Sequence, residues 1–286
     1  MTTFIDGLSL GSIYALIALG YTMVYGIAKM LNFAHGDVIM VGAYAVLSTL
    51  TLTGHPILGV VVAVVICTVL GVVMEKVAYK PLRGASPLAV LITAIGVSYL
   101  LQSIAQLVFG SKSRAISLGN FGAVKIGSVE INMATIITLA VAAVIMLVLQ
   151  LFVKYTKTGR AMIAVSEDRG AAALMGINVN RIIAITFVIG SILAGAGGVL
   201  YATAYPQVDP NMGYIPGLKA FVAAVLGGIG SIPGAMAGGI ILGIAETLTK
   251  GYLSSQYADA ISYIILIVIL LVKPAGLFGK KTTVKV

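Results

Sequence analysis

Long apolar stretches with almost no charged residue limit this chain more than any other feature. An α-helix needs about 20 mostly apolar residues to cross the hydrocarbon core of a bilayer, and most of these stretches approach that length. A transmembrane β-barrel would instead show segments of about 10 residues with alternating polarity. We therefore predict an all-α, polytopic bundle of about eight membrane helices, forming one transmembrane domain over residues 1–286. The firmest predicted spans are 8–28, 38–53, 57–74, 87–109, 131–153, 182–201 and 257–273.

Composition excludes a water-soluble domain and a nucleic-acid partner. Charged residues make up 9% of the chain, against about 25% in soluble domains. The net charge of +9 is attributed to loops, because Lys and Arg favour the cytoplasmic loops of membrane proteins. The single cysteine, Cys67, lies in an apolar run and is expected to be a buried free thiol. The N-terminus shows no signal-peptide pattern, so we expect the first helix to be retained.

The positive residues predict which side faces the cytoplasm. If helices alternate in direction, loops 75–86 and 154–181 lie on the same side as the C-terminal tail. That side carries twelve positive residues: Lys76, Lys80, Arg83, Lys154, Lys157, Arg160, Arg169, Arg181, Lys273, Lys280, Lys281 and Lys285. The opposite side carries five: Lys112, Arg114, Lys125, Lys219 and Lys250. The twelve-residue side is therefore predicted to be cytoplasmic, with the C-terminus inside. The side of the N-terminus stays open, because two interrupted segments allow either.

Those two interruptions lie at 29–37, "KMLNFAHGD", and at 227–234, "GGIGSIPG". In each place an apolar helix stops, a short glycine-containing break follows, and a glycine-rich apolar helix resumes. For 218–249 we expect either two half-helices that meet inside the membrane or one strongly broken pair of helices. Ser231 is the expected N-cap of the second piece, and Pro233 lies in its first turn. Interrupted helices in two halves of a chain indicate a transport path. The alternative is that the glycines only let helices pack closely.

The loop at 154–181 is too short and too charged to cross the membrane. Thr158 is expected to cap a helix over 159–166, and Ser166 or Asp168 a second helix that ends before Gly176. The second helix would present a flat alanine surface to a soluble partner. The alternative is a helix that lies on the membrane surface.

Four long stretches, in order, resemble the membrane permeases of bacterial ABC importers for branched-chain amino acids. They are "GLSLGSIYALIALGYTMVYGIAKMLNFAHGD", "VAYKPLRGASPLAVLITAIGVSYLLQ", "GRAMIAVSEDRGAAALMGINVNRIIAITFVIGSILAGAGGVL" and "KAFVAAVLGGIGSIPGAMAGGIILGIAE". The resemblance implies a permease subunit of the bacterial inner membrane that pairs with a second, related permease. It also implies two cytoplasmic ATPase subunits and an extracytoplasmic amino-acid-binding protein as partners, with no cofactor. The chain has no phosphate-binding P-loop sequence, so ATP hydrolysis would belong to the partner subunits.

The resemblance also suggests functional residues. The segment 159–177 matches the loop that docks on the ATPase, and its expected contacts are Gly159, Arg160, Glu167, Asp168, Ala172, Leu174, Gly176 and Ile177. The expected translocation-path residues are Asn32, Phe33, His35, Gly36, Asp37, Gly230, Ser231 and Pro233. In this interpretation, backbone N–H groups freed at 34–38 would accommodate passing carboxylates.

Several alternatives remain at the level of sequence. The first break could be a cytoplasmic turn, with Lys29 and Asp37 solvated, Asn32 capping the next helix and His35 in a loop. The cargo could be urea, an amide or another small solute. A different class is a stand-alone channel or ion-coupled carrier, which would need an embedded carboxylate such as Glu246. A non-transporting scaffold is a third class. Neither a catalytic nor a metal site is predicted, because no nucleophile or ligand set accompanies His35.

Overall fold

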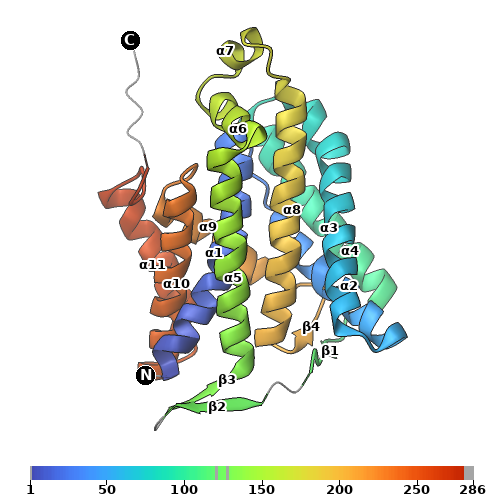
Figure 1. Ribbon diagram of the computed structural model, residues 1–286, viewed down its shortest axis with the longest axis vertical. Helices are drawn as coiled ribbons and strands as arrows, with labels where there is room; N and C mark the ends of the chain where they lie inside the picture. The colour runs from blue at the N-terminus through green and yellow to red at the C-terminus, as the bar shows by residue number, and fades with distance from the viewer. Residues whose placement is uncertain (1, 120–121, 127–128, 280–286) are drawn as a thin grey trace.

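The computed structural model describes residues 2–119, 122–126 and 129–279, which form a helical bundle with short strands at one end (Figure 1). The helices are α1 (Thr2–Ala28), α2 (His35–Thr53), α3 (Pro56–Met74), α4 (Pro87–Phe109), α5 (Met133–Tyr155), α6 (Lys157–Glu167), α7 (Arg169–Leu174), α8 (Val179–Ala204), α9 (Tyr214–Gly227), α10 (Ile232–Tyr252) and α11 (Tyr257–Val272). A π-helical turn, η1 (Glu75–Tyr79), and a 3-10 turn, η2 (Lys80–Leu82), extend α3. The predicted all-α membrane bundle is confirmed.

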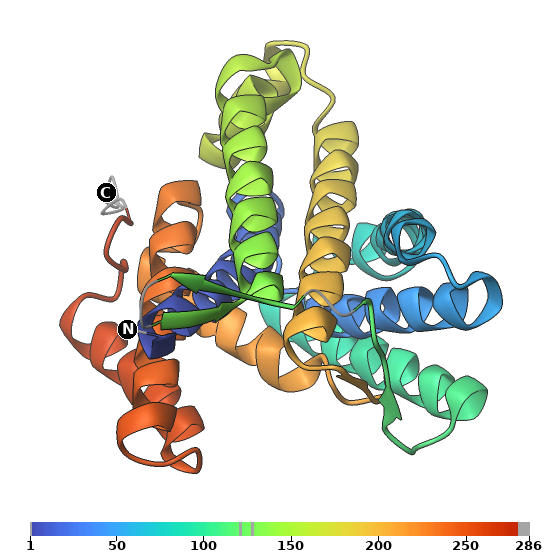
Figure 2. The ribbon, with the colours of Figure 1, turned by 60° about the horizontal axis from the view of Figure 1, so that its bottom comes forward.

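In the described part of the chain, four short strands form two antiparallel pairs at the end of the bundle opposite to α7 (Figure 1), the end that is turned toward the viewer in Figure 2. β1 (Arg114–Ala115) pairs with β4 (Gln207–Val208), and β2 (Ala123–Ile126) pairs with β3 (Val129–Asn132). The long connection before α5 therefore contains a hairpin. Its Lys125 and Glu130 are opposite each other in the register.

Among the described residues, seven helices are long and apolar enough to cross a membrane. Two predictions at the C-terminal end need correction. The span expected at 257–273 is α11, a helix of 16 residues that is shorter than these seven. The stretch 218–249 is the broken pair of helices and not two half-helices that meet inside the membrane: α9 has 14 residues, whereas α10 has 21 and is a candidate span. The glycines at 227–230 end α9 early, and α10 then runs uninterrupted because Pro233 lies in its first turn.

α1 lies at the centre of the bundle, and a glycine seam joins it to α10. A Cβ atom on Gly239 would clash with the backbone of Ala15, and one on Gly243 would clash with the backbone of Gly11. Small residues let helix backbones approach this closely in lipid. The packing role expected for these glycines is therefore confirmed.

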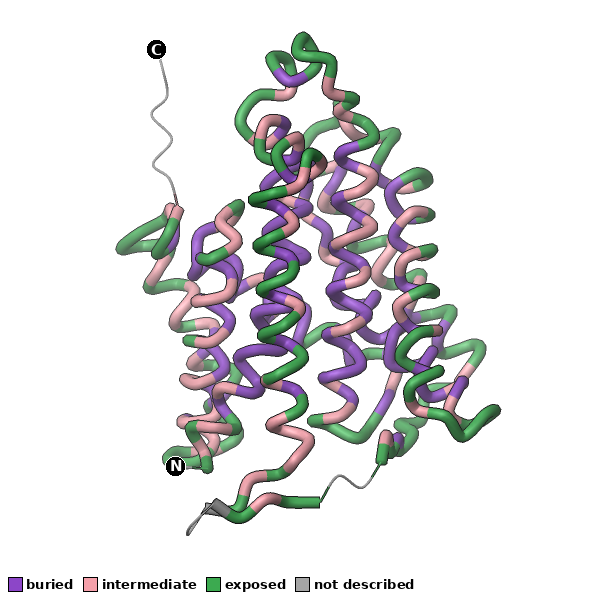
Figure 3. The backbone as a smooth tube through the Cα atoms, in the orientation of Figure 1, coloured by how far each residue is buried: buried purple, intermediate pink, exposed green. Residues whose placement is uncertain are grey.

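The outer helices bear apolar side chains on the surface of the bundle, whereas buried residues gather on the central helices (Figure 3). Val69, Leu107, Val144 and Leu271 are examples on α3, α4, α5 and α11. An apolar outer surface is what lipid contact requires. Cys67 on α3 is buried and free, as predicted.

One end of the bundle gathers the segments that charge counting placed together. Arg83, after η2, donates to the side chain of Asn180 beside the start of α8. The backbone N–H groups of Leu277 and Phe278 donate to carbonyls at the end of α9, at 2.9 Å each. The tail lysines at 280, 281 and 285 lie outside the described residues. Lys219 does not belong to an opposite-side loop, because it lies within α9 and is 3% exposed.

Candidate translocation path and coupling helices

The chain after α1 folds back into the bundle before α2 begins. His35, the first residue of α2, lies with its Nε2 against Gly20 of α1. At 1.5 Å per helical residue, Gly20 is roughly 12 Å from Ala28 at the end of α1, well inside a bilayer core of about 30 Å. α2 therefore begins at the depth of Gly20, well before the end of α1. His35 is buried and helical, so the prediction of a loop histidine is wrong.

α9 begins beside α2. A Cβ atom on Gly213 would clash with the carbonyl of Gly36, and one on Gly217 would lie 2.7 Å from the Cα atom of Gly36. The two helix starts meet with backbone in direct contact because all three residues are glycines. The structure thus joins the break at 29–37 to the start of α9. Sequence reasoning did not connect these two segments.

The second predicted break lies at the end of the bundle near α6. Gly230 has a φ of +94° and lies against Gly26 near the end of α1. Ser231 Oγ accepts a hydrogen bond from the N–H of Gly234 at 3.2 Å, so its predicted N-cap role is confirmed. Because α9 rises from its junction with α2 to this end, Gly230, Ser231 and Pro233 form a turn there and do not meet the Asp37 region.

Two further expectations for the first break are wrong. Asn32 does not cap α2: its Oδ1 accepts from the Tyr79 hydroxyl at 2.7 Å, and the N-cap position is Ala34, which has no side-chain cap. Nor are most backbone N–H groups at 34–38 free. Those of His35, Asp37 and Val38 donate to carbonyls of the turn, and Gly36 bonds to Tyr21. They are therefore unavailable to a passing carboxylate.

Asp37 is the charged residue at this junction. The interpretation of the first break as a cytoplasmic turn requires a solvated Asp37. The residue is only 2% exposed, so its side chain is not solvated. Gln102 on α4 donates from Nε2 to Oδ1 at 2.9 Å, and Ser98 provides a second hydrogen bond. Of the three ionisable residues in the first break, Lys29, His35 and Asp37, only Lys29 is exposed; its φ is +51°.

A cavity of about 300 Å³ lies beside Asp37. Five of its residues come from α4, which sequence reasoning did not connect to the path, because no local pattern links positions so far apart. The lining consists of Tyr21, Phe33, Asp37, Leu91, Ile95, Ser98, Tyr99, Gln102, Tyr214 and Leu218. The junction of two helix starts thus holds a buried carboxylate at the wall of a mostly apolar and aromatic cavity.

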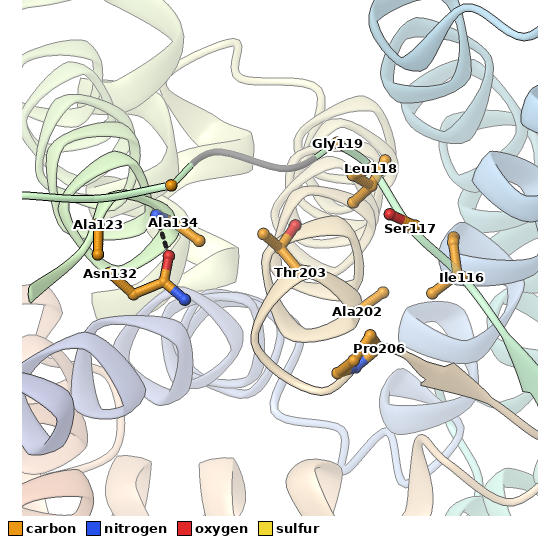
Figure 4. A pocket seen from close by; sticks show the side chains of 11 residues that line it. Ile116, Ser117, Leu118, Gly119, Ala123, Asn132, Ala134, Ala202, Thr203 and Pro206 are labelled. Atoms are coloured by element: carbon orange, nitrogen blue, oxygen red, sulfur yellow. Dashed lines mark hydrogen bonds between the residues drawn. The ribbon is translucent and has the colours of Figure 1, made fainter.

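A larger cavity, of about 490 Å³, lies at the end opposite α7. Figure 4 shows its lining, which includes Thr203 in the last turn of α8 and Pro206 just after that helix. It also includes Asn132, which caps α5 by accepting from the N–H of Ala134 at 2.9 Å. Its lining residues carry no charge. We therefore regard the smaller cavity at Asp37 as the more specific candidate site.

Sequence reasoning missed a network of buried charges next to the junction. Lys219 Nζ lies 2.7 Å from Glu246 and 2.6 Å from Asp259, and Lys250 lies 2.7 Å from Glu246. Tyr14 also donates to Glu246 at 2.9 Å. Charge counting had only placed both lysines on the side opposite to the cytoplasm. The network ties α9 to α1, α10 and α11.

The predicted coupling helices are present, with corrections at their starts. Thr156, not Thr158, caps α6 and accepts from the N–H of Gly159 at 2.9 Å. Asp168 caps α7 as predicted, accepting from Ala171 at 3.0 Å. Gly159 is buried, and a Cβ there would clash with the backbone of Val153 near the end of α5. Gly159 therefore packs α6 against α5.

The predicted alanine surface of α7 is only partly exposed. Ala172 is buried, and Ile177 is packed against the core, whereas Leu174 is 91% and Met175 83% exposed. Gly176 has a φ of +82° and donates to Ala173 at 3.0 Å, in the helix-ending role predicted for it. Arg160 and Glu167 are exposed on α6. Leu174 and Met175 form an apolar tip at the end of α7, which lies at one extremity of the molecule (Figure 1).

Arg169 fixes this tip to the first interruption. Its guanidinium donates to the carbonyls of Ile27, at 3.2 Å, and of Ala28, the last residues of α1. Burial lowers the pKa of Arg169 from its ordinary value, and the charge of Arg83 acts in the same direction. The start of α7 is therefore in direct contact with the point where the chain turns back toward Asp37.

Taken together, membrane-length helices, a path-like junction at mid-depth and a short exposed helix pair define a polytopic membrane transport subunit. The family model described as "Branched-chain amino acid transport system / permease component" matches residues 3–270. The chain belongs to that family, and it is a permease component and not an enzyme.

Curated relatives extend over nearly the whole chain. The permease protein LivH of Escherichia coli K12, of a high-affinity branched-chain amino acid transport system, is 47% identical and the alignment covers 98% of this chain and 96% of that protein. LivH of Salmonella typhimurium is 46% identical with the same coverage. BraD of Pseudomonas aeruginosa is 43% identical over 99% of this chain and 96% of its own length.

Proposed function

We propose that this chain is a permease subunit of a bacterial ABC importer for branched-chain amino acids, located in the inner membrane. Support comes from relatives whose names state that transport function, at 43–47% identity over almost full length. The whole chain, 1–286, acts as one transport domain, with 159–177 as its coupling segment. A second, related permease completes the translocation path, and an extracytoplasmic amino-acid-binding protein delivers the cargo.

The observation that carries the coupling role is the exposed apolar tip of α7. Large apolar side chains exposed at the end of a helix pair, away from the lipid-facing helices, are typical of a contact with another protein. Leu174 and Met175 would enter a groove on one of two cytoplasmic ATPase subunits. Arg160, Glu167 and Asp168 surround the tip with polar contacts. This places the α7 end of the bundle in the cytoplasm, together with the positively charged segments of the chain.

A physical route joins this tip to the path. Movement of α7 acts through Arg169 on the end of α1 and thus on the segment that leads to Asp37. In this scheme Phe33, Gly36 and Asp37 line or shape the path. Asn32, through Tyr79, fixes the returning segment to η1, and Gly230, Ser231 and Pro233 form the turn between α9 and α10.

The test is reconstitution in liposomes with the partner subunits encoded by neighbouring genes. ATP-dependent leucine uptake that requires both the ATPases and the binding protein is the expected result. Uptake of urea or amides but not leucine would replace the cargo assignment. Uptake by this chain alone, driven by an ion gradient, would favour the carrier. No uptake with any partner would favour a scaffold.

The carrier alternative already has a specific weakness at Glu246. That carboxylate was its candidate coupling group, but it is held by two lysines and a tyrosine hydroxyl and is 1% exposed. A coupling group must exchange its cation during transport. Glu246 is poorly suited to this role, because its counter-ions are two lysine side chains of the same protein, which cannot leave the site.

A further inference from the structure

We infer that the cavity beside Asp37 is a substrate site that binds the ammonium group and the aliphatic side chain of an α-amino acid. This rests on the proposed function for the identity of the cargo. It goes further because it places a selective substrate site within the permease itself. The proposed function alone would also be satisfied by a path that does not select its cargo. Asp37 is assigned the role of the ammonium acceptor.

The charge of Asp37 sets it apart from the other buried carboxylates. Among the described residues three carboxylates are buried: Asp37, Glu75 and Glu246. Glu75 is paired with Arg83, and Glu246 with two lysines. In the described part of the chain no Lys, Arg or His nitrogen lies within 4.0 Å of the Asp37 carboxylate. An ionisable group at membrane depth without a counter-ion is costly, and by default indicates a functional site.

The donors around Asp37 are neutral and hold it in place. Gln102 and Ser98 lie one helical turn apart on α4, and Gln102 Nε2 also reaches Ser98 Oγ at 3.3 Å. Hydrogen bonds from neutral groups orient a carboxylate without cancelling its charge. The wall of the cavity therefore keeps a negative charge that a bound ammonium would neutralise.

The rest of the lining suits an aliphatic side chain. Phe33, Leu91, Ile95 and Leu218 contribute apolar surface, and a volume of about 300 Å³ is at the lower end of the range for small-molecule sites. No cationic side chain lines the cavity. The site therefore recognises the ammonium and the side chain, and the inference assigns no partner to the cargo carboxylate.

The cavity is also placed where the proposed assembly requires it. It touches both helix starts at the junction through Asp37 and Tyr214. On its outer side Tyr99 is 66% and Ile95 42% exposed. The second permease subunit of the proposed pair would close this side, so cargo would be held between the two subunits.

The test is equilibrium binding of radiolabelled leucine to the assembled transporter in nanodiscs, without the binding protein. The competitor is α-hydroxyisocaproate, which has a hydroxyl in place of the ammonium. Wild type should bind leucine at least about 30-fold more tightly than the competitor, because removing one partner of a buried charge pair has an effect of that size. Asp37→Asn should lose that preference, whereas the control Asp6→Asn, an exposed carboxylate of α1, should keep it.

Each outcome has a defined meaning. Unchanged leucine binding in Asp37→Asn overturns the inference, and so does an absence of leucine binding in a wild-type complex that shows ATP-driven uptake. A variant that loses only a dependence on Na⁺ or pH indicates an inorganic cation and also overturns it. Failure of ATP-driven leucine uptake in the wild type contradicts the proposed function instead.

A second variant covers the case in which Asp37→Asn does not assemble. Ile95→Phe adds volume at a partly exposed position of the cavity and leaves every charge in place. It should weaken leucine binding about tenfold, which is the scale of a small size mismatch in an apolar pocket. Normal leucine affinity in Ile95→Phe would overturn the inference.

Discussion

Asp37 and Glu246 are both carboxylates buried among the membrane helices, yet their surroundings differ. Glu246 lies 2.7 Å from Lys219 and 2.7 Å from Lys250, and it accepts a hydrogen bond from Tyr14. Asp37 receives hydrogen bonds from neutral groups, those of Gln102 and Ser98. One carboxylate is neutralised by its own chain, and the other is not.

This difference separates a structural role from a binding role. The Glu246 network connects four helices, so its removal should affect stability. Asp37 joins α2 to α4 through two neutral hydrogen bonds and borders a cavity, so its removal should affect ligand binding more than folding. The following experiments test that separation, in order of expected effect.

Lys219→Met should have the largest effect. Lys219 connects Glu246 with Asp259, and breaking a buried ion pair by removing one partner costs on the order of 3–5 kcal/mol. Thermal stability of the purified protein, followed by size-exclusion chromatography, measures the loss. Asp37→Asn in the same assay should lose less than about 1 kcal/mol, because the amide oxygen can still accept from Gln102.

A double variant serves as the control for this prediction. Lys219→Met combined with Glu246→Met removes the fully buried charges and leaves Lys250 and Asp259, whose side chains are 33% and 55% exposed, to water. It should recover much of the lost stability. A single Lys219→Met variant as stable as wild type would contradict the structural role of the network.

Gly213→Val tests the junction on which the position of Asp37 depends. The new Cβ would clash with the carbonyl of Gly36, and overpacking of this kind costs about 1–3 kcal/mol or more. Leucine binding should fall with stability, because the start of α2 is displaced. Gly96→Val on α4 is the matched control, since nothing lies within 4 Å of a Cβ there. Equal behaviour of the two variants would mean that the junction is not tightly packed.

Gly176→Val addresses the coupling tip and should leave both carboxylates unaffected. A β-branched residue at a φ of +82° is strained by about 1–3 kcal/mol, so the end of α7 should rearrange. Co-purification of the ATPase and ATP-driven uptake should decrease while membrane insertion is retained. Gly84→Val is the control, because Gly84 has open space and no positive φ. Unchanged transport in Gly176→Val would remove the argument for this segment.

Glu130→Gln should have the smallest effect. Glu130 pairs with Lys125 across the β2–β3 hairpin at 4.0 Å, with side chains that are 62% and 75% exposed. Exposed pairs of this kind contribute less than about 1 kcal/mol. The melting temperature should therefore hardly change, in contrast to Lys219→Met. A large loss would show that the hairpin is held by more than its strand pairing.

Features set by neighbouring residues could be predicted from the sequence. The apolar spans, the Asp168 cap, the Ser231 cap and the helix-ending role of Gly176 all depend on residues within a few positions. Their physical causes are hydrogen bonds and backbone conformations that one helical turn can satisfy. The exact start of α6 was misplaced by two residues, because Thr156 and Thr158 are equally good capping types.

Features that need distant partners could not be predicted. Asn32 bonds to Tyr79 rather than capping α2, and Asp37 meets Gln102 from a helix 65 positions away in the chain. Charge counting gave Lys219 only a side of the membrane, and only the fold brings Glu246 and Asp259 next to it. The meeting of Gly36 with Gly213 likewise depends on how α9 returns into the bundle.

The glycine seam between α1 and α10 has a consequence for motion. The backbones of the two helices touch at Gly11, Gly239 and Gly243. Sliding or rolling of one helix against the other would cause steric clashes. We therefore expect α1 and α10 to move as one rigid unit. The opening and closing that transport demands must then involve other helices, such as α2 and α4, which have few backbone contacts with this pair.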